Sequence, residues 1–314
     1  MRPHEGIRAH QRELSFLNKM KDATKKEEVL VEALPYIQAY EGKTFVIKYG
    51  GAAMTDENLK QTFAKDVTIL RKIGISIVIV HGGGKEITDV ASRLGYETRF
   101  VNGQRYTDQN MVETVVMVLA GKVNKEIVKS INQTGGNAVG LCGVDNSLLK
   151  VKKASNGVDL GLVGEVTSVN TSFLNLLLTH GMMPVIAPIG VNDQGTILNV
   201  NADLAAGAIA AALKAEKLVY LSDIEGILLD KKLISTLTKL EADKLIDQGT
   251  IFGGMIPKVK SAFDTVNAGV NKVHIIDGRV KHSLLLEIFT DEGIGTQMVS
   301  GGSAEKITEA LKQQ

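Results

Sequence analysis

Residues 75–84, ISIVIVHGGG, are a run that is apolar except for Ser76 and ends in one histidine and three consecutive glycines. Residues 44–51, TFVIKYGG, repeat the pattern, with a lysine near the end of the run and two glycines after it. A strand that is apolar without alternation is buried on both faces, which is typical of parallel strands covered by helices. The two stretches therefore predict buried parallel strands that each end at a glycine-rich turn.

The same pattern recurs along the chain and alternates with helical periodicity. Three further apolar runs are 183–189 before Gly190, 217–222 before Asp223, and 272–276 before Asp277 and Gly278. The helical patterns between the runs are Glu57–Ile73, Glu86–Leu94, Asp108–Asn132, Ala202–Lys214 and Lys258–Ala268. This alternation predicts an α/β chain, a three-layer αβα sandwich around a central, mainly parallel sheet. Because ligands bind beyond the carboxyl ends of such strands, we expect these turns to lie together at one edge.

Two segments depart from the alternation. Residues 140–169 carry turn residues between short strand-like pieces, which predicts the hairpins of an antiparallel lid or flap. Residues 1–42 precede the first strand and include apolar residues on one helical face, so we expect an N-terminal helical extension. Pro35 lies within that pattern and is expected to kink or interrupt the helix.

Composition excludes several classes of protein. The chain has 314 residues, of which 44% are hydrophobic and 23% charged, and its net charge is +1. This balance is typical of soluble globular proteins and does not favour nucleic acid as a partner. Cys142 is the only cysteine, which rules out an internal disulfide and a zinc site built from cysteines. The N-terminus has no apolar signal segment and the apolar runs are too short to cross a bilayer, so we expect a cytoplasmic protein with no membrane partner.

Two lysines, Lys48 and Lys258, occupy positions that favour an anionic ligand. Lys48 stands near the carboxyl end of an apolar strand, before glycines that allow a ligand to approach the backbone. Lys258 follows Gly253 and Gly254 at the start of a helix, where a positive charge opposes the helix dipole unless an anion also binds there. Each lysine alone has a structural alternative, because a long side chain at such a position also extends to water.

The glycines after His81 expose successive backbone N–H groups at a helix N-terminus, which suits an anion or a developing negative charge. The Walker A pattern does not occur in the chain, and Ile87 breaks the dinucleotide pattern that begins at Gly82. The motif therefore indicates neither a P-loop NTPase nor an ordinary NAD enzyme. We expect His81 to be structural, or at most a contact to the ligand.

Polar residues in two further segments match a carboxylate substrate. Arg105, within NGQRYT at 102–107, is able to pair with a carboxylate through two hydrogen bonds, although a lone loop arginine is usually a solvated surface charge. In NVNAD at 199–203, Asn201 is a natural N-cap, and Asp203 then lies in the first helical turn. Phosphoryl transfer to a carboxylate needs positioning and charge stabilisation but no general base, because a carboxyl of pKa about 4.3 is already ionised.

Six motifs stand in order within residues 43–299: KYGG at 48–51, HGGG at 81–84, NGQRYT at 102–107, NVNAD at 199–203, SDIEG at 222–226 and GGMIPK at 253–258. Together they resemble the amino-acid kinase family. Within it they are closely similar to the members that phosphorylate the side-chain carboxylate of N-acetyl-L-glutamate with ATP, the second step of arginine biosynthesis. The resemblance implies MgATP as co-substrate, with Mg²⁺ held mainly by phosphates, so that no protein metal ligand is expected.

The resemblance also implies roles for individual residues. Lys48 and Lys258 would stabilise the transition state, and Asp203 would orient both. The residues implied for substrate binding are Gly83, Gly84, Arg105 at the α-carboxylate and Asn199 near the N-acetylamino group. Those implied for ATP binding are Gly50, Gly51, Ser222, Asp223, Gly226, Ile227, Thr250, Ile251 and Phe252.

The chain further resembles the arginine-regulated branch of the family. The L-arginine site would comprise His274, Gly278, Glu287 and Gly293, although a last strand, a capped helix and a glycine-rich turn explain most of these residues structurally. The extension 1–42 would interlace dimers into a hexamer, a trimer of dimers, and a PII-type signalling protein is a further candidate partner. Residues 43–214 would then form the acetylglutamate-binding lobe with the dimer interface, and residues 215–314 the nucleotide-binding lobe with the arginine site.

Two alternatives remain open from the sequence. The first is another amino-acid or carbamate kinase of the same fold. Arg105 and Asn199 argue against it, because they match a free α-carboxylate and an N-acyl group. The second is a non-catalytic nucleotide- or arginine-binding regulator, which the presence of Lys48, Asp203 and Lys258 argues against.

Overall fold

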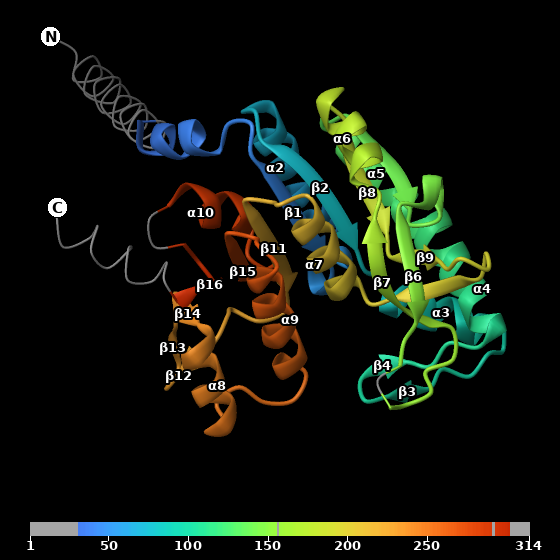
Figure 1. Cartoon of the computed structure of the whole chain (residues 1–314). Coiled ribbons are helices and arrows are strands. Elements are labelled where there is room, and N and C mark those ends of the chain that lie inside the picture. The colour runs from blue at the N-terminus through green and yellow to red at the C-terminus, as the bar shows by residue number, and fades with distance from the viewer. Residues whose placement is uncertain (1–30, 156, 291–292, 302–314) are drawn as a thin grey trace, which may run out of the picture.

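An eight-stranded sheet forms the centre of the molecule in the computed structural model, which describes residues 31–155, 157–290 and 293–301 (Figure 1). Its strands are β1 (Thr44–Tyr49), β2 (Ser76–His81), β5 (Ala138–Cys142), β8 (Met183–Ala187), β11 (Lys217–Ser222), β14 (Thr236–Thr238), β15 (Lys272–Asp277) and β16 (Thr296–Val299). They are arranged in the order β14-β16-β15-β11-β1-β2-β8-β5, and the six strands from β15 to β5 run parallel. Only β16 and β14 run in the opposite direction. The prediction of a mainly parallel sheet is confirmed.

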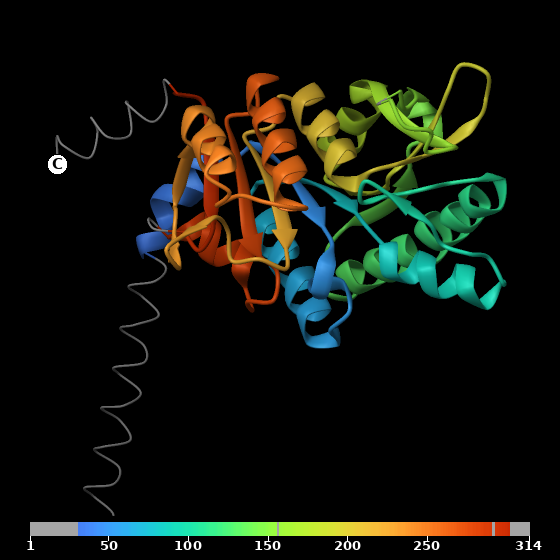
Figure 2. The ribbon, with the colours of Figure 1, turned by 90° about the horizontal axis from the view of Figure 1, so that it is seen from below.

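Helices cover both faces of this sheet, as Figures 1 and 2 show. One layer comprises α2 (Glu57–Lys72), α3 (Gly84–Arg93), α4 (Gln109–Val116), α5 (Asn124–Gln133) and α10 (Ser283–Phe289). The other comprises α6 (Thr171–Thr179), α7 (Ala202–Ala212), α8 (Lys239–Asp247) and α9 (Met255–Asn267). Successive residues of β1 pack alternately on the two sides: Phe45 and Ile47 in the first layer, Val46 in the second. Because both faces are buried, the strand is apolar without alternation, as its sequence indicated.

A small closed barrel stands beside the sheet. It is built from β6 (Leu149–Lys153), β7 (Val163–Val169), β9 (Ile189–Val191) and β10 (Ile197–Val200). The antiparallel pair β6–β7 lies within the predicted flap, but residues 140–142 at the start of that flap belong to β5 of the main sheet. The turn expected at Gly190 is wrong, because this glycine lies inside β9. A Cβ at Gly190 would lie 2.3 Å from Cγ1 of Val151, so close strand packing accounts for the glycine.

The remaining strands of the described residues form two short hairpins. They are β3 (Phe100–Val101) with β4 (Gln104–Arg105), and β12 (Leu228–Leu229) with β13 (Lys232–Leu233). Short helical turns are η1 (Gly51–Met54) and η3 (Asp145–Ser147). The helix predicted at 108–132 is α4 and α5 joined by a π-helical segment, η2 (Met117–Val123).

The N-terminal extension enters the described part of the chain only from residue 31. Residues 31–40 are helical, and the helix continues past Pro35, so the expected interruption is wrong for these residues. Proline removes one backbone donor, and the helix is maintained by its other hydrogen bonds. The remainder of the predicted extension, residues 1–30, lies outside the described residues. No described helix has the length and apolar character needed to span a membrane.

The carboxyl ends of β1, β2 and β11 lie side by side. Lys48 is in register with Val80 of β2 and with Tyr220 of β11, and Tyr49 is in register with His81. The turns that follow these three strands therefore meet at one edge of the sheet, as the sequence predicted.

Candidate active site

Lys48, Asp203 and Lys258 meet at this edge although they come from three distant segments. Lys48 lies on β1, Asp203 in the first turn of α7 and Lys258 in the first turn of α9. Nζ of Lys48 lies 3.0 Å from Oδ1 of Asp203, and Nζ of Lys258 lies 2.6 Å from Oδ2. We call these three residues the charge cluster. One carboxylate thus bridges two ammonium groups, and 15% of each lysine side chain is exposed.

The position of Asp203 follows from the capping of α7. Oδ1 of Asn201 accepts hydrogen bonds from the N–H of Asp203 at 2.9 Å and of Leu204 at 3.2 Å, which confirms the predicted N-cap. Tyr220, fully buried on β11, donates its hydroxyl to the carbonyl of Asp203 at 3.3 Å. Nζ of Lys258 lies 5.0 Å from the centroid of the Tyr220 ring. The cap and the tyrosine therefore hold the first turn of α7 against the neighbouring strand.

Electrostatic interactions within the charge cluster favour an ionised carboxylate. Burial raises the pKa of Asp203, but Lys48 and Lys258 outweigh this effect and hold the pKa below its ordinary value. Burial lowers the pKa of Lys258, and Asp203 opposes part of that shift. With all three groups ionised, the cluster carries a net positive charge, which is suited to an anionic ligand.

A cleft of about 430 Å³ opens between the turn after β1 and the start of α3, and its lining includes Gly51, Gly83 and Gly84. At its edge, the N–H of Ala52 donates to Oδ1 of Asp223 at 2.6 Å, which ties the β1 turn to the end of β11. A Cβ at Gly51 would lie 2.3 Å from that oxygen. Glycine therefore lets the β1 turn close onto Asp223.

Gly50 plays the same part beside the charge cluster. A Cβ at this position would lie 2.7 Å from Nζ of Lys48. The glycine pair that follows β1 thus gives room to the lysine ammonium on one side and to an aspartate on the other. Because Gly51 lines the cleft and Gly50 precedes it, Lys48 lies beside the cleft.

Arg105 is buried, so its alternative as a solvated surface charge is wrong. Nη2 donates to the carbonyl of Gly84 at 2.8 Å and to Oγ1 of Thr88 at 2.9 Å. The guanidinium carbon lies 4.9 Å from the centroid of the Phe100 ring on β3. Burial lowers the pKa of Arg105. These contacts place a cation at the first turn of α3, next to the cleft.

Asn199, on β10, belongs to the same hydrogen-bond network. Its Nδ2 donates to Oγ1 of Thr107 at 3.2 Å, and Oγ1 of Thr107 donates to the carbonyl of Arg105 at 3.1 Å. Thr107 is fully buried and was not proposed from the sequence as a site residue. The network brings two of the predicted substrate residues, Arg105 and Asn199, together.

Four of the nine predicted nucleotide residues, Ser222, Asp223, Gly226 and Ile227, lie at the end of β11 or shortly after it. The N–H of Ile227 donates to Oγ1 of Thr296 at 2.8 Å, and Gly226 packs against the same threonine with φ of 140°. The carbonyl of Ser222 accepts a hydrogen bond of 2.8 Å from the N–H of Gly278. This segment is thus held against β15 and β16.

Thr250, Ile251 and Phe252 form the turn between α8 and α9. The N–H groups of Thr250 and Ile251 both donate to the carbonyl of Leu245, at 2.9 and 3.0 Å. Ile251 is buried, whereas 69% of Phe252 is exposed. Because α9 begins shortly after this turn and carries Lys258 in its first turn, the predicted nucleotide residues adjoin the charge cluster.

Two of the four residues predicted for an arginine site, His274 and Gly293, lie against the buried carboxylate of a third, Glu287. Oε1 of Glu287 lies 2.5 Å from Nδ1 of His274, and Oε2 accepts from the N–H of Ile294 at 2.7 Å and of Gly295 at 3.1 Å. Gly293 has φ of 61°, and a Cβ there would lie 2.9 Å from Oε2. Burial raises the pKa of Glu287, but the bond from His274 and the backbone donors outweigh it, so the pKa lies below its ordinary value. Burial also lowers the pKa of His274, so a neutral imidazole donates to an ionised carboxylate.

Gly278, the fourth predicted residue, lies instead beside Ser222, at the nucleotide end of β15. The structure adds two residues that the sequence interpretation missed. Lys217 is 4% exposed and interacts electrostatically with Glu287, and its Nζ lies 4.7 Å from the centroid of the Tyr40 ring. Burial lowers the pKa of Lys217 to about 8. The sequence signal that could have identified Lys217 is its position at the start of an apolar strand. Lysine is rarely buried without a partner, so a lysine at such a position indicates one.

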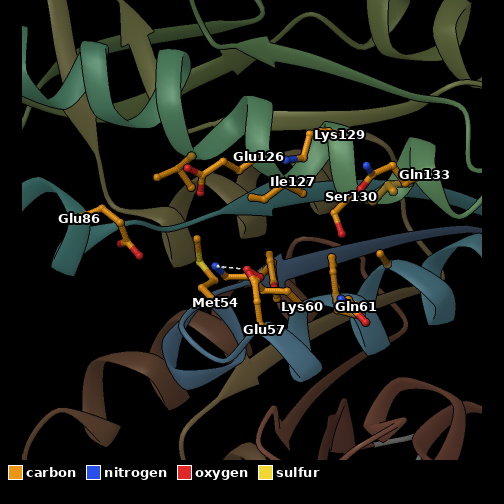
Figure 3. Close-up of a pocket in the computed structure, with 15 residues that line it drawn as sticks. Met54, Glu57, Lys60, Gln61, Glu86, Glu126, Ile127, Lys129, Ser130 and Gln133 are labelled. Atoms are coloured by element: carbon orange, nitrogen blue, oxygen red, sulfur yellow. Dashed lines mark hydrogen bonds and ion pairs between the residues drawn. The ribbon is translucent and has the colours of Figure 1, made fainter.

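A separate cavity of about 450 Å³ lies between α2 and α5, on the side of β1 that carries Tyr49 (Figure 3). Glu57 and Lys60 from α2 face Glu126 and Lys129 from α5. Nζ of Lys60 lies 3.4 Å from Oε1 of Glu57, and the rim carries charges of both signs. No member of the charge cluster lines this cavity or the cleft, but Gly51 of the cleft directly follows Gly50, which lies against the Lys48 ammonium, so we place the candidate chemistry at the cleft.

Comparison with known proteins identifies relatives over most of the chain. The model of the amino acid kinase family matches residues 43–277. An acetylglutamate kinase of Chlorobaculum tepidum is 57% identical over 281 residues, which cover 90% of this chain and 99% of that protein.

Solved structures share the fold. N-acetylglutamate synthase from Neisseria gonorrhoeae, complexed with coenzyme A and N-acetyl-glutamate, matches with a TM-score of 0.78 at 28% identity, covering 87% of this chain and 63% of the synthase chain. The same synthase complexed with coenzyme A and L-arginine matches with a TM-score of 0.74 at 26% identity, covering 85% and 64%. A carbamate kinase of Giardia has a TM-score of 0.62 at 16% identity over 82% of this chain and 99% of that chain, a likeness of fold alone.

Proposed function

The chain belongs to the amino acid kinase family, and we propose that it transfers the γ-phosphoryl group of ATP to the side-chain carboxylate of N-acetyl-L-glutamate. The products are ADP and N-acetyl-L-glutamyl 5-phosphate, which would make this the second step of arginine biosynthesis. The observation that carries the proposal is the charge cluster, in which one carboxylate holds two lysines beside a cleft. The 57% identity to an acetylglutamate kinase supports the choice of acceptor.

In the proposed reaction, the two lysines stabilise the charge on the transferring phosphoryl group. Lys48 would lie between the donor and acceptor oxygens, and Lys258 would face the nucleotide phosphates. Asp203 would keep both ammonium groups oriented before the substrates bind, so that little reorganisation is needed during the reaction. The acceptor carboxylate is ionised at neutral pH, so the reaction needs no general base.

The acceptor would occupy the side of the cleft next to α3. Arg105 would pair with its α-carboxylate, and Asn199 would contact the N-acetylamino group through an amide that Thr107 orients. The backbone N–H groups of Gly83 and Gly84, at the N-terminus of α3, would donate to the oxygens of the reacting carboxylate.

The nucleotide would lie over residues 222–227 and 250–252, with its phosphates directed to the turn at Gly50 and Gly51. The exposed ring of Phe252 gives that surface an apolar face for the base. Mg²⁺ would be held mainly by phosphate oxygens and water, as this hard cation usually is in kinases. Within the described part of the chain, no group of three His, Cys, Asp or Glu side chains could hold a metal ion.

We further propose that L-arginine inhibits the enzyme at the Glu287 site. An ionised, buried carboxylate is complementary to a guanidinium group. The related Neisseria synthase was solved with L-arginine, which supports L-arginine as the ligand but does not locate its site. The lobe at 215–314 would carry both this site and the nucleotide, and the lobe at 43–214 would carry the acceptor and the dimer interface.

The proposed assembly is a cytoplasmic hexamer, a trimer of dimers joined by the extension at residues 1–42. A PII-type signalling protein is a further candidate partner of such a ring. Light scattering of the intact chain tests the assembly, and a dimer in that measurement would remove the interlacing role of the extension.

Hydroxylamine trapping tests the proposed reaction, because an acyl phosphate reacts with hydroxylamine to give a hydroxamate. The protein is incubated with ATP, Mg²⁺ and a panel of acceptors that includes N-acetyl-L-glutamate, L-glutamate and L-aspartate. We expect hydroxamate from N-acetyl-L-glutamate. Product from another acid, with none from N-acetyl-L-glutamate, would support the alternative of a different kinase with this fold.

A further inference from the structure

His81 is fully buried at the end of β2 and has no part in the chemistry proposed above. It is nevertheless hydrogen-bonded through both ring nitrogens. Nδ1 lies 2.8 Å from the carbonyl oxygen of Gly82, and Nε2 lies 3.2 Å from Nδ2 of Asn124. Asn124, the first residue of α5, is also fully buried. Two buried polar side chains thus lie directly under the glycine loop that lines the cleft.

These partners determine which ring nitrogen of His81 carries the proton. The carbonyl of Gly82 only accepts, so Nδ1 is protonated. Nδ2 of Asn124 also lies 2.8 Å from the carbonyl of Val185 and 3.3 Å from that of Leu141, which identifies it as the amide nitrogen. Nε2 of His81 is therefore an acceptor. Burial lowers the pKa of His81 to about 4, so the ring is neutral at neutral pH.

The hydrogen bond from His81 determines the orientation of the peptide between Gly82 and Gly83. None of the described peptide bonds is cis, and in a trans peptide the C=O and N–H groups point in opposite directions. Because the Gly82 carbonyl is turned toward His81, the Gly83 N–H is directed away from His81, and Gly83 is one of the residues that line the cleft. No group among the described residues accepts a hydrogen bond from this N–H. The loop therefore presents an oriented donor with no protein partner.

The helix beneath the loop supports the same arrangement. The π-helical segment η2 ends directly before Asn124, and the side-chain oxygen of Asn124 accepts from Nζ of Lys125 at 3.1 Å. Leu119, within η2, would lie 2.5 Å from a Cβ at Gly83. Segments of π-helix are rare and frequently occur at functional sites. Here the π-helical segment packs against the glycine loop and leads into the residue that holds His81.

We propose that His81, held by Asn124, is a positioning residue for phosphoryl transfer. Its Nδ1–H keeps the Gly82–Gly83 peptide in the orientation that presents the Gly83 N–H to the reacting oxygens. The inference rests on the proposed function, because that function assigns the cleft to the acceptor carboxylate. A loop of three glycines is otherwise highly flexible, and a donor oriented in advance stabilises the transition state without reorganisation. The effect is therefore expected in kcat rather than in the KM for MgATP.

Two matched variants of the full chain, His81→Asn and His81→Gln, separate positioning from simple packing. An asparagine places an amide N–H near the former position of Nδ1, whereas a glutamine places it near that of Nε2. Both variants keep a polar side chain under the loop, so comparable losses of melting temperature are expected. We expect the Asn variant to keep kcat within about threefold of wild type and the Gln variant to lose at least about tenfold. The KM for MgATP should change little in either variant.

Equal losses of kcat in the two variants, or losses that simply follow melting temperature, would overturn the positioning role. Wild-type protein in the same assay tests the proposed function separately. If it phosphorylates another acid instead, that function fails, and the ratio between the variants is measured with that acid. Crystal structures of both variants give a test that does not depend on enzyme activity. The Gly82–Gly83 peptide should keep its orientation in the Asn variant and change it in the Gln variant. An unchanged peptide in the Gln variant would contradict the inference.

Discussion

Replacing Asp203 by asparagine removes the negative charge of the cluster and preserves the shape of the side chain. The carboxylate lies 3.0 Å from one ammonium nitrogen and 2.6 Å from the other. At an effective dielectric constant of about 20, each pair attracts by roughly 5–6 kcal/mol before desolvation is subtracted. Removing one partner of a buried ion pair costs about 3–5 kcal/mol, since the remaining charge is left unpaired. We therefore expect Asp203→Asn to lose about 3 kcal/mol of stability, roughly 5–10 °C in melting temperature.

The same change should move the alkaline limit of activity. In the wild-type chain Asp203 opposes the burial that lowers the pKa of Lys258. Without the carboxylate this pKa falls further, so the lysine loses its proton, and its role in the reaction, at a lower pH. A profile of kcat against pH should therefore show its alkaline limb at lower pH in the variant, with kcat at pH 7 reduced about 10²-fold.

The stability difference should also depend on pH. Because the pKa of Asp203 is depressed in the folded chain, its stabilisation is present above the unfolded pKa of about 4 and is lost as pH falls through the folded pKa. Melting temperatures of wild type and Asp203→Asn should converge below about pH 4. The matched control is Asp193→Asn, which removes an exposed pair with Lys150 and should cost less than about 1 kcal/mol. A variant at position 203 with wild-type kcat and an unmoved alkaline limb would refute the electrostatic reasoning.

Four further predictions concern the remaining site residues and the N-terminal extension. Lys48→Ala and Lys258→Ala should each lower kcat by about 10² or more with unchanged circular dichroism; near-normal turnover in both would show that the lysines are misassigned. Arg105→Gln should raise the KM for N-acetyl-L-glutamate by about 10–100-fold, whereas the KM for ATP stays the same; equal changes in both constants would indicate general loosening. Glu287→Gln should weaken inhibition by L-arginine at least about tenfold in a dose–response assay, and undiminished inhibition would place the effector elsewhere. Deletion of residues 1–42 should convert hexamers to dimers in light scattering, and a hexamer that survives the deletion would contradict the role of the extension.

Most of the sheet and the charge cluster could be predicted from the sequence because the relevant signals are local. Each of Lys48, Asp203 and Lys258 stands at the end of a strand or the beginning of a helix, and parallel strands bring such ends to one edge. The capping of α7 by Asn201 was likewise visible in a few adjacent residues.

Two expectations that failed, the turn at Gly190 and the surface position of Arg105, depended on partners distant in sequence. Whether Gly190 ends a strand or lies inside one is determined by Val151 on the neighbouring strand of the barrel. The alternative that Arg105 is a solvated surface charge is wrong because the burial of this side chain depends on Phe100 across a hairpin and on the first turn of α3. The hydrogen bond between His81 and Asn124 joins two elements that no local pattern connects.

The proposed arginine site shows the same limit. Lys217 and Tyr40 both interact electrostatically with Glu287, although they come from β11 and from the helix at 31–40. The sequence interpretation identified His274, Glu287 and Gly293 through their resemblance to known regulated kinases and had no means of adding these two neighbours.

The most direct test of the account is the stoichiometry of product formation with purified protein. ADP release and hydroxamate formation are measured together in reactions that contain MgATP, hydroxylamine and a single acceptor. The acceptor is N-acetyl-L-glutamate in one reaction and L-glutamate in the comparison. We predict one hydroxamate for each ADP with N-acetyl-L-glutamate and a far lower rate with L-glutamate, whose amino group lacks the acyl substituent assigned to Asn199. ADP release without hydroxamate, or equal rates with the two acids, would contradict this prediction.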